Sequence, residues 1–171
     1  MSVVIPYNRE KAVEYAKKHA LERDDSFFDF TDFGGNCTAF VSQCLFYANG
    51  IMNPFPVLGW YYYSNINRSP SWSGVEFFYK FMTNNSNLGP FAKVCDVKEV
   101  EVGDIVQLKF YGYDNFTHTL LITKITDEPS VRSAKNIYLS ANTYDVFNKN
   151  LLTYHFKEVR YLKVLGVYAN N

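Results

Sequence analysis

Residues 33–44 read Phe33-Gly34-Gly35-Asn36-Cys37-Thr38-Ala39-Phe40-Val41-Ser42-Gln43-Cys44. The two glycines and the asparagine favour a turn. The apolar residues that follow recur with the period of one helix face: Phe40, Val41, Cys44, Leu45 and Ala48. Gly50 stops the pattern, as a glycine just past a helix end often does. The stretch therefore predicts a helix that is buried along one side, with Cys37 in its first turn.

A cysteine at the start of a helix has chemical consequences. The first backbone N–H groups of a helix have no partner within it, and the helix dipole places partial positive charge there. Both effects stabilise a thiolate, so we expect a lowered pKa and a usable nucleophile at Cys37. The same N–H groups can bind the oxyanion of a tetrahedral intermediate. The competing interpretation is a structural cysteine, because most buried cysteines are inert.

Composition limits the classes of protein to be considered. The chain has 171 residues, of which 47% are hydrophobic and 18% aromatic, and this suits one domain spanning 1–171 with a packed core. The formal net charge is zero, with 17 basic and 17 acidic residues. Nucleic-acid binding needs a basic surface, so the charge balance argues against nucleic acid as the main partner. We expect a monomer.

The three cysteines are Cys37, Cys44 and Cys95. Cys37 and Cys44 stand two helical turns apart, roughly 10 Å along the axis, which is too far for a disulfide. No CxxC or HxxxH spacing points to zinc. Free thiols are therefore expected, without a metal site and without a cofactor.

The ends of the chain and its apolar runs bear on localisation. No stretch of about 18 apolar residues is present, so we expect no membrane span. Residues 1–6 lack the charged and apolar regions of a signal peptide. Three explanations stay open: a cytoplasmic protein, export by another route, or a fragment of a longer chain.

Two further helices are predicted. Residues 7–23 carry an apolar stripe of small side chains. A second helix should begin at Ser73, which has the spacing of a capping box with Glu76, and end near Asn84. The side chains that we expect it to bury are Phe77, Phe78 and Phe81.

Residues 52–73 show no clear period and contain many aromatic residues. Long ordered connections often carry binding elements, and aromatic side chains with polar tips suit a peptide or sugar cleft. One interpretation therefore makes this segment a substrate-binding loop, with contacts from Trp60, Tyr62 and Trp72. The other, equally favoured, is a satellite hydrophobic cluster.

The second half of the chain predicts strands. Periods of two or short apolar runs occupy residues 105–110, 119–125, 137–141 and 158–168. Helices come first and strands follow, which is typical of an α+β fold with an antiparallel sheet.

A cysteine nucleophile needs a base and a group that orients the base. His118 stands at the mouth of the second predicted strand and is favoured over His155, which lies in an alternating segment. Asn142, just after the third strand, could accept a proton from the imidazole if the two strands pair. Asp145 is the charged alternative, and Asn142 could instead be a simple turn residue.

Six blocks of the sequence together resemble the putative amidase-domain family of Firmicutes, within the papain-like NlpC/P60 and CHAP group of cysteine amidohydrolases and peptidases. The blocks cover almost the whole chain, and the cysteine block is the most specific. They are Tyr7-Asn8-Arg9, Gly34 to Gln43, Ser71-Trp72, Gly103-Asp104, Thr117-His118-Thr119 and Ser140 to Asp145. The chain departs from the family pattern at Ala39, where Asn is usual, and at Asn142, where His is usual.

The resemblance implies a papain-like NlpC/P60-type fold, with helices packed on an antiparallel sheet. It implies a cysteine amidohydrolase with Cys37 as nucleophile, His118 as base and acid, and Asn142 as the orienting residue. Asn36 is a candidate oxyanion donor, and Tyr7 a supporting polar group. The expected substrate is a peptide or peptidoglycan fragment, and the family suggests a secreted or cell-wall location.

Two other classes of function stay open. The same triad would serve an acyl-transfer, deamidating or isopeptidase effector, for example a toxin domain delivered by a partner. A catalytically silent module could instead use the aromatic segment to bind a peptide or the cell wall. The reactivity of Cys37 distinguishes the last class, because a binding module has no reason to keep that thiol activated.

Overall fold

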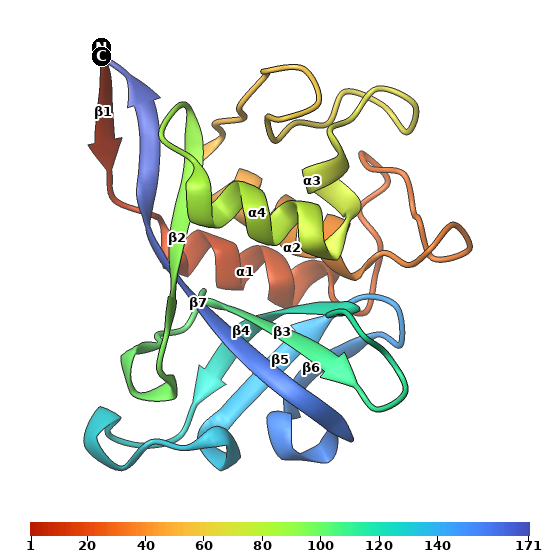
Figure 1. Cartoon of the computed structure of the whole chain (residues 1–171), viewed down its shortest axis with the longest axis vertical. Coiled ribbons are helices and arrows are strands. Elements are labelled where there is room, and N and C mark those ends of the chain that lie inside the picture. The colour runs from red at the N-terminus through yellow and green to blue at the C-terminus, as the bar shows by residue number, and fades with distance from the viewer.

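The computed structural model describes residues 1–171 and shows a mixed α/β fold (Figure 1). Its strands form one seven-stranded sheet in which every pairing is antiparallel. The helices are α1 (Arg9–His19), α2 (Cys37–Asn49), α3 (Pro70–Ser73) and α4 (Val75–Asn84). The strands are β1 (Ser2–Ile5), β2 (Gly89–Cys95), β3 (Ile105–Phe110), β4 (His118–Ile125), β5 (Ile137–Ala141), β6 (Val146–Asn150) and β7 (Phe156–Asn170). These observations confirm the predicted α+β class with an antiparallel sheet. The more specific papain-like, NlpC/P60-type fold stays a prediction.

The sheet is organised around β7, which is 15 residues long. Its first part pairs with β3, its last part pairs with β1 on the same edge, and β2 pairs along the opposite edge. Hydrogen bonds between neighbouring strands connect the sheet along the path β1-β7-β3-β4-β5-β6, with β2 bonded to β7 outside this path. β4 therefore lies inside the sheet, and six of its eight residues, starting with His118, are buried.

Helix α2 lies at the centre of the molecule, against α1, α3 and β4 (Figure 1). Its bounds agree with the prediction, and Gly50 ends it in the left-handed conformation with φ 69°. Its burial differs from the prediction of one apolar side, because ten of its thirteen residues are buried. A helix that is covered on several faces has little need for an amphipathic pattern.

Several element boundaries differ from the predictions. α1 is shorter than residues 7–23. The capping box of Ser73 and Glu76 is wrong, because Ser73 belongs to α3 and α4 starts after Gly74 without a side-chain cap. Phe78 and Phe81 are buried as expected, but Phe77 is 58% exposed. The prediction missed β1, β2 and β6, which are short or edge strands with weak alternation.

The aromatic residues of the segment before α4 belong to the core. Trp60 and Trp72 are completely buried, with ring centroids 4.9 Å apart. Ser42 links both residues to α2, because its hydroxyl accepts a hydrogen bond from Trp60 Nε1 and donates one to the carbonyl oxygen of Trp72. Tyr62 is half-buried and its hydroxyl accepts from the Phe28 N–H. This placement corrects the prediction of a substrate cleft at Trp60 and Trp72, because buried rings cannot reach a ligand.

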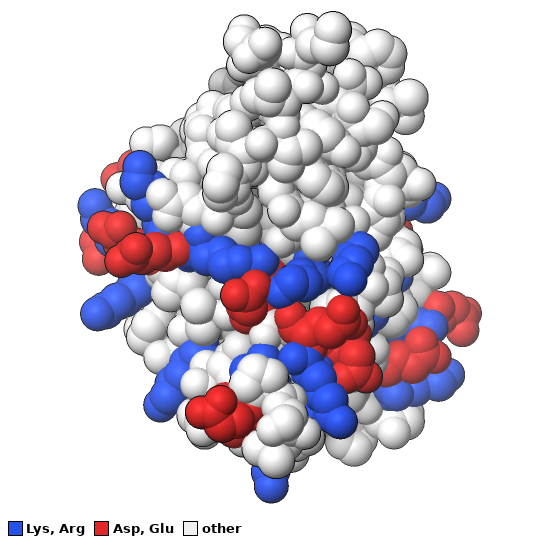
Figure 2. All heavy atoms as spheres, turned by 90° about the vertical axis from the view of Figure 1, so that its left-hand side faces the viewer, with Lys and Arg blue, Asp and Glu red and all other residues white.

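Charged side chains are distributed unevenly over the surface. Figure 2 shows a face whose upper part has no Lys, Arg, Asp or Glu, whereas positive and negative side chains alternate across the lower part. The sequence has long stretches without a charged side chain, at residues 1–8, 44–67, 81–92 and 164–171. Among the helices, none has both the length and the apolar character needed to cross a bilayer.

Candidate active site

Cys37 is the first residue of α2, as the sequence predicted, and it is 7% exposed. The chain enters the helix through Gly34 and Gly35, whose φ angles of 99° and 103° are strained for any residue with a Cβ. Asn36 precedes the helix and makes no capping bond; its side-chain oxygen accepts instead from the backbone N–H of Phe30. The first N–H groups of α2 are therefore left without a side-chain cap.

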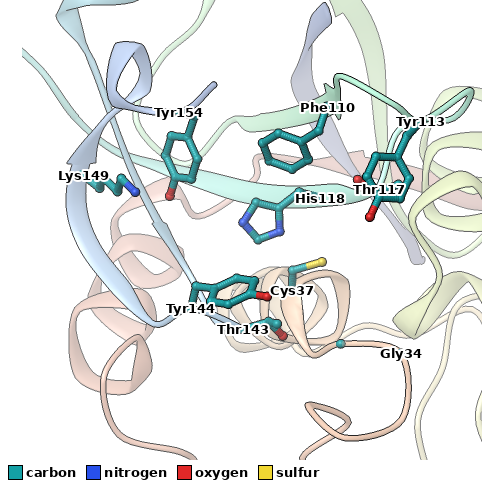
Figure 3. Close-up of a pocket in the computed structure, with 11 residues that line it drawn as sticks. Gly34, Cys37, Phe110, Tyr113, Thr117, His118, Thr143, Tyr144, Lys149 and Tyr154 are labelled. Carbon is teal, nitrogen blue, oxygen red and sulfur yellow. The ribbon is translucent and has the colours of Figure 1, made fainter. Parts of the chain in front are cut away.

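His118 is the first residue of β4 and is 8% exposed. It lines the same cavity as Cys37, and this cavity has a volume of about 350 Å³. Figure 3 shows the imidazole of His118 facing the end of α2 that carries Cys37. The structure therefore brings together two of the predicted catalytic residues, 81 positions apart in the chain. No hydrogen bond joins the sulfur to the imidazole, and neither ring nitrogen of His118 has a hydrogen-bond partner.

A buried polar network holds α2 against β4 beside these two residues. The hydroxyl oxygens of Thr38 and Thr119 are 2.8 Å apart. Gln107 of β3 donates to Thr119 at 3.1 Å, and Arg160 of β7 donates to Gln107 at 2.8 Å. Each candidate catalytic residue is thus followed in sequence by a threonine that is anchored to the other element.

The environment of the cavity shifts the pKa values of both residues. Burial raises the pKa of the Cys37 thiol, although backbone N–H groups of Thr119 and Thr38 oppose the rise. Burial also lowers the pKa of His118 to about 4, and the positive charge of Lys149 contributes in the same direction. The predicted lowering of the Cys37 pKa is therefore wrong for the free protein, because loss of solvent outweighs the effect of the helix end. At neutral pH the pair is a thiol and a neutral imidazole.

Asn142 does not contact His118 through a hydrogen bond. Its side-chain oxygen accepts from Asn36 Nδ2 at 3.0 Å, and its nitrogen donates to the carbonyl oxygen of Ala20 at 2.9 Å. The strand register explains this arrangement. Leu121 pairs with Ser140, so the register continued by two residues sets Asn142 opposite Thr119, on the sheet face that α2 covers.

The remaining predicted polar residues lie outside the cavity lining. The Asp145 carboxylate is partly exposed and pairs with Arg23 at 2.9 Å. The Tyr7 hydroxyl donates to the carbonyl oxygen of Gly103 at 2.8 Å, and burial raises the pKa of Tyr7 well above its ordinary value. Asn36 is 1% exposed, and one of its two side-chain N–H groups donates to Asn142.

Besides Gly34 and Gly35, seven further residues line the cavity without having been predicted as site residues. Two of them, Thr143 and Tyr144, form a turn with φ angles of 58° and 60°, a conformation that costs energy for residues other than glycine and is often found at functional sites. Thr143 also accepts a 2.6 Å hydrogen bond from the Asn36 N–H. The full set is Phe110, Tyr113, Thr117, Thr143, Tyr144, Lys149 and Tyr154.

Other thiol and histidine side chains lie elsewhere. Cys44 is buried in the core two turns further along α2, and Cys95 is half-buried on β2; neither lines the cavity, and all three cysteines are free. His155 is exposed and its ring packs on Tyr111. No group of three or more His, Cys, Asp or Glu side chains is placed so as to hold a metal ion.

Comparisons with known proteins give a family and a curated relative for this chain. Residues 6–164 match the model of a family described as "Putative amidase domain". The chain is also 33% identical over 118 residues to the uncharacterized protein YhbB of Bacillus subtilis (strain 168), and the alignment covers 68% of this chain and 37% of that relative. No solved structure matches the chain. Because the family model spans nearly the whole fold, including Cys37 and His118, the chain belongs to the putative amidase domain family, whose description indicates amide hydrolysis.

Proposed function

We propose that this protein hydrolyses amide bonds through a covalent intermediate on Cys37, with His118 as general base and acid. The observation that carries the proposal is the meeting of these two side chains in one cavity, at the start of α2 and the start of β4. A thiol beside an imidazole is the minimum that nucleophilic amide cleavage requires. Membership of the amidase domain family supports the same reaction class.

The reaction proceeds in two stages. The neutral imidazole of His118 takes the Cys37 proton as the sulfur attacks the carbonyl carbon, forming a C–S bond. The backbone N–H of Cys37, at the uncapped start of α2, stabilises the oxyanion. The imidazolium then protonates the leaving nitrogen as the C–N bond breaks. A water molecule, deprotonated by His118, releases the acyl group and restores the thiol.

Asn142 has a different role in this proposal from the one that the sequence predicted. Its two hydrogen bonds connect Asn36, immediately before the nucleophile, to the end of α1. It acts as a positioning residue for the start of α2. The proposal does not use the Asn36 side chain as the oxyanion donor, because Asn36 lies outside the cavity lining and one of its two side-chain N–H groups donates to Asn142.

The fold and the substrate are further parts of the proposal. The order of a cysteine at a helix start, a histidine at a strand start and a strand beyond it supports a papain-like, NlpC/P60-type or CHAP-type domain spanning 1–171. This resemblance favours amides of peptidoglycan stem peptides as substrates. A monomer with no cofactor is sufficient for the mechanism.

The test uses muropeptides released from peptidoglycan, with products identified by mass spectrometry. Wild type should cleave an amide bond, and the variants Cys37→Ala and His118→Gln should lose at least about 100-fold in rate, which is typical for loss of a nucleophile or general base. Cys95→Ser is the matched control, because this thiol lies outside the cavity. Equal cleavage by Cys37→Ala and wild type would refute the mechanism. Transfer of the acyl group to an added amine in place of water would identify an acyltransferase instead.

A further inference from the structure

One end of the cavity contains two polar groups that the proposed mechanism does not use. The Tyr154 hydroxyl is buried and has no hydrogen-bond partner. The Lys149 amino group lies 4.2 Å from the centroid of the Tyr154 ring. Figure 3 shows the lysine and the tyrosine hydroxyl on the same side of the His118 ring. Two hydrogen-bond donors are thus presented to the same part of the cavity.

The positive charge of Lys149 has no counterpart in this cavity. No Asp or Glu side chain belongs to the lining, and Lys149 forms no salt bridge. Other half-buried lysines of the sheet are paired: Lys109 lies 3.1 Å from Glu158, and Lys163 lies 2.7 Å from Glu101. A buried hydroxyl without a partner also carries a free-energy cost. Both groups would be satisfied by one anion.

We propose that Lys149 and Tyr154 form a subsite for a carboxylate of the substrate, so that the preferred amide substrate carries a free carboxylate near the scissile bond. This inference rests on the function proposed above and narrows its substrate class. A carboxylate fits because it accepts a charge-assisted hydrogen bond from the lysine and a second hydrogen bond from the tyrosine. Burial raises the pKa of Tyr154 to about 12, so its hydroxyl stays protonated and able to donate at neutral pH.

The subsite also connects substrate binding to the general base. The charge of Lys149 disfavours a proton on His118. A carboxylate bound to Lys149 neutralises that charge, so the imidazolium that forms during attack by Cys37 becomes less unfavourable. A substrate without the carboxylate leaves His118 a weaker base. Recognition of the anion therefore acts on the rate of acylation as well as on binding.

The first experiment measures alkylation of Cys37 by matched reagents, namely N-bromoacetyl amino acids and their C-terminal primary amides, with glycine, β-alanine and 4-aminobutanoate spacers. In wild type at least one acid should react about tenfold faster than its amide, the selectivity of roughly one charge-assisted hydrogen bond. Lys149→Met should abolish this preference, Lys149→Arg should keep it and Tyr154→Phe should reduce it. Lys124→Met is the control, because Lys124 also lies over a tyrosine ring but outside the cavity.

Equal rates for acid and amide in wild type, or a preference that survives Lys149→Met, would overturn the subsite. The proposed function would still stand if alkylation depended on His118, so the two failures are distinguishable. A second measurement does not need a reactive thiol. In Cys37→Ala, N-acetylglycine should shift the His118 ring resonances in NMR spectra and raise the His118 pKa, and N-acetylglycinamide should do neither. Identical spectra with the two probes would also overturn the subsite.

Discussion

The hydroxyl oxygens of Thr38 and Thr119 lie 2.8 Å apart, one residue after Cys37 and one residue after His118. This contact holds the start of α2, which carries Cys37, beside the start of β4, which carries His118. Thr119 also accepts from Gln107, so both hydroxyls belong to a completely buried network. The relative position of the two candidate catalytic residues therefore depends on neighbours that take no part in the chemistry.

Thr119→Val should weaken both the fold and the site. The substitution preserves the shape of the side chain but leaves Thr38 and Gln107 with unsatisfied polar groups, which costs about 1–3 kcal/mol. Urea unfolding should show that loss, and cleavage by the folded variant should fall. Thr119→Ser is the control, because it retains the hydroxyl; if it lost as much cleavage activity as the valine variant, the hydrogen bond would not be the cause.

The pKa of His118 predicts an acid-sensitive fold. Folded His118 titrates at about 4, below the ordinary value near 6.5, so between these values the unfolded state binds more protons and stability falls as pH falls. The full contribution is present above about pH 6.5, and it decreases by about 1.4 kcal/mol per pH unit towards pH 4. The measurement compares the unfolding free energy of wild type and His118→Gln from pH 7 to pH 4. The difference between them should depend on pH; a constant difference would show that His118 is not desolvated.

Asn142 and Asn36 should be coupled in their contributions to the stability of the fold. Asn142→Ala leaves Asn36 Nδ2 and the Ala20 carbonyl group without their partner, so we expect a loss of about 1–3 kcal/mol. In a double-mutant cycle with Asn36→Ala, the coupling energy should be at least about 0.5 kcal/mol. The His118 pKa, measured by NMR, should stay unchanged in Asn142→Ala. A shifted His118 pKa would instead support the triad that the sequence suggested.

Among the ion pairs, we expect the loss of Arg9–Asp104 to lower the stability of the fold most. Asp104 is completely buried, accepts from the Val164 N–H and lies 2.6 Å from Arg9, which also donates to the Val164 carbonyl oxygen. The pair thus supplies hydrogen-bond partners for the backbone N–H and carbonyl oxygen of Val164. Val164 lies in β7 between the residues that pair with β3 and those that pair with β1. Removing one partner of such a pair typically costs about 3–5 kcal/mol.

The test for this pair is Arg9→Met, with Arg9→Lys as the matched variant that keeps the charge. Burial already raises the pKa of Asp104 against the opposing effect of Arg9, so without Arg9 the carboxyl should protonate more readily. The destabilisation of Arg9→Met relative to wild type should consequently shrink as pH is lowered from 7 to 4. A difference that stays constant with pH would show that the Asp104 charge is not what Arg9 stabilises.

The local patterns of the sequence predicted α2 and the strands at 105–110 and 137–141 with correct bounds. These elements are long or strongly apolar, and glycines near the ends of α2 and of the 105–110 strand are additional local signals. β1, β2 and β6 were missed because their pairing partners, rather than their own residues, make them strands. Trp60 and Trp72 were ambiguous for a related reason, since aromatic residues suit a core and a cleft equally well.

For the site, the sequence by itself indicated the candidate nucleophile, the candidate base and the family motif around them, because helix starts and strand starts can be recognised locally. Only the tertiary structure decided what these residues contact. Strand register turned Asn142 towards Asn36, and burial set the pKa values of Cys37 and His118 against the expectation from the helix end. The structure also brought Lys149 and Tyr154 into the cavity. Register, burial and long-range proximity depend on contacts between distant segments, so no local pattern of residues contains them.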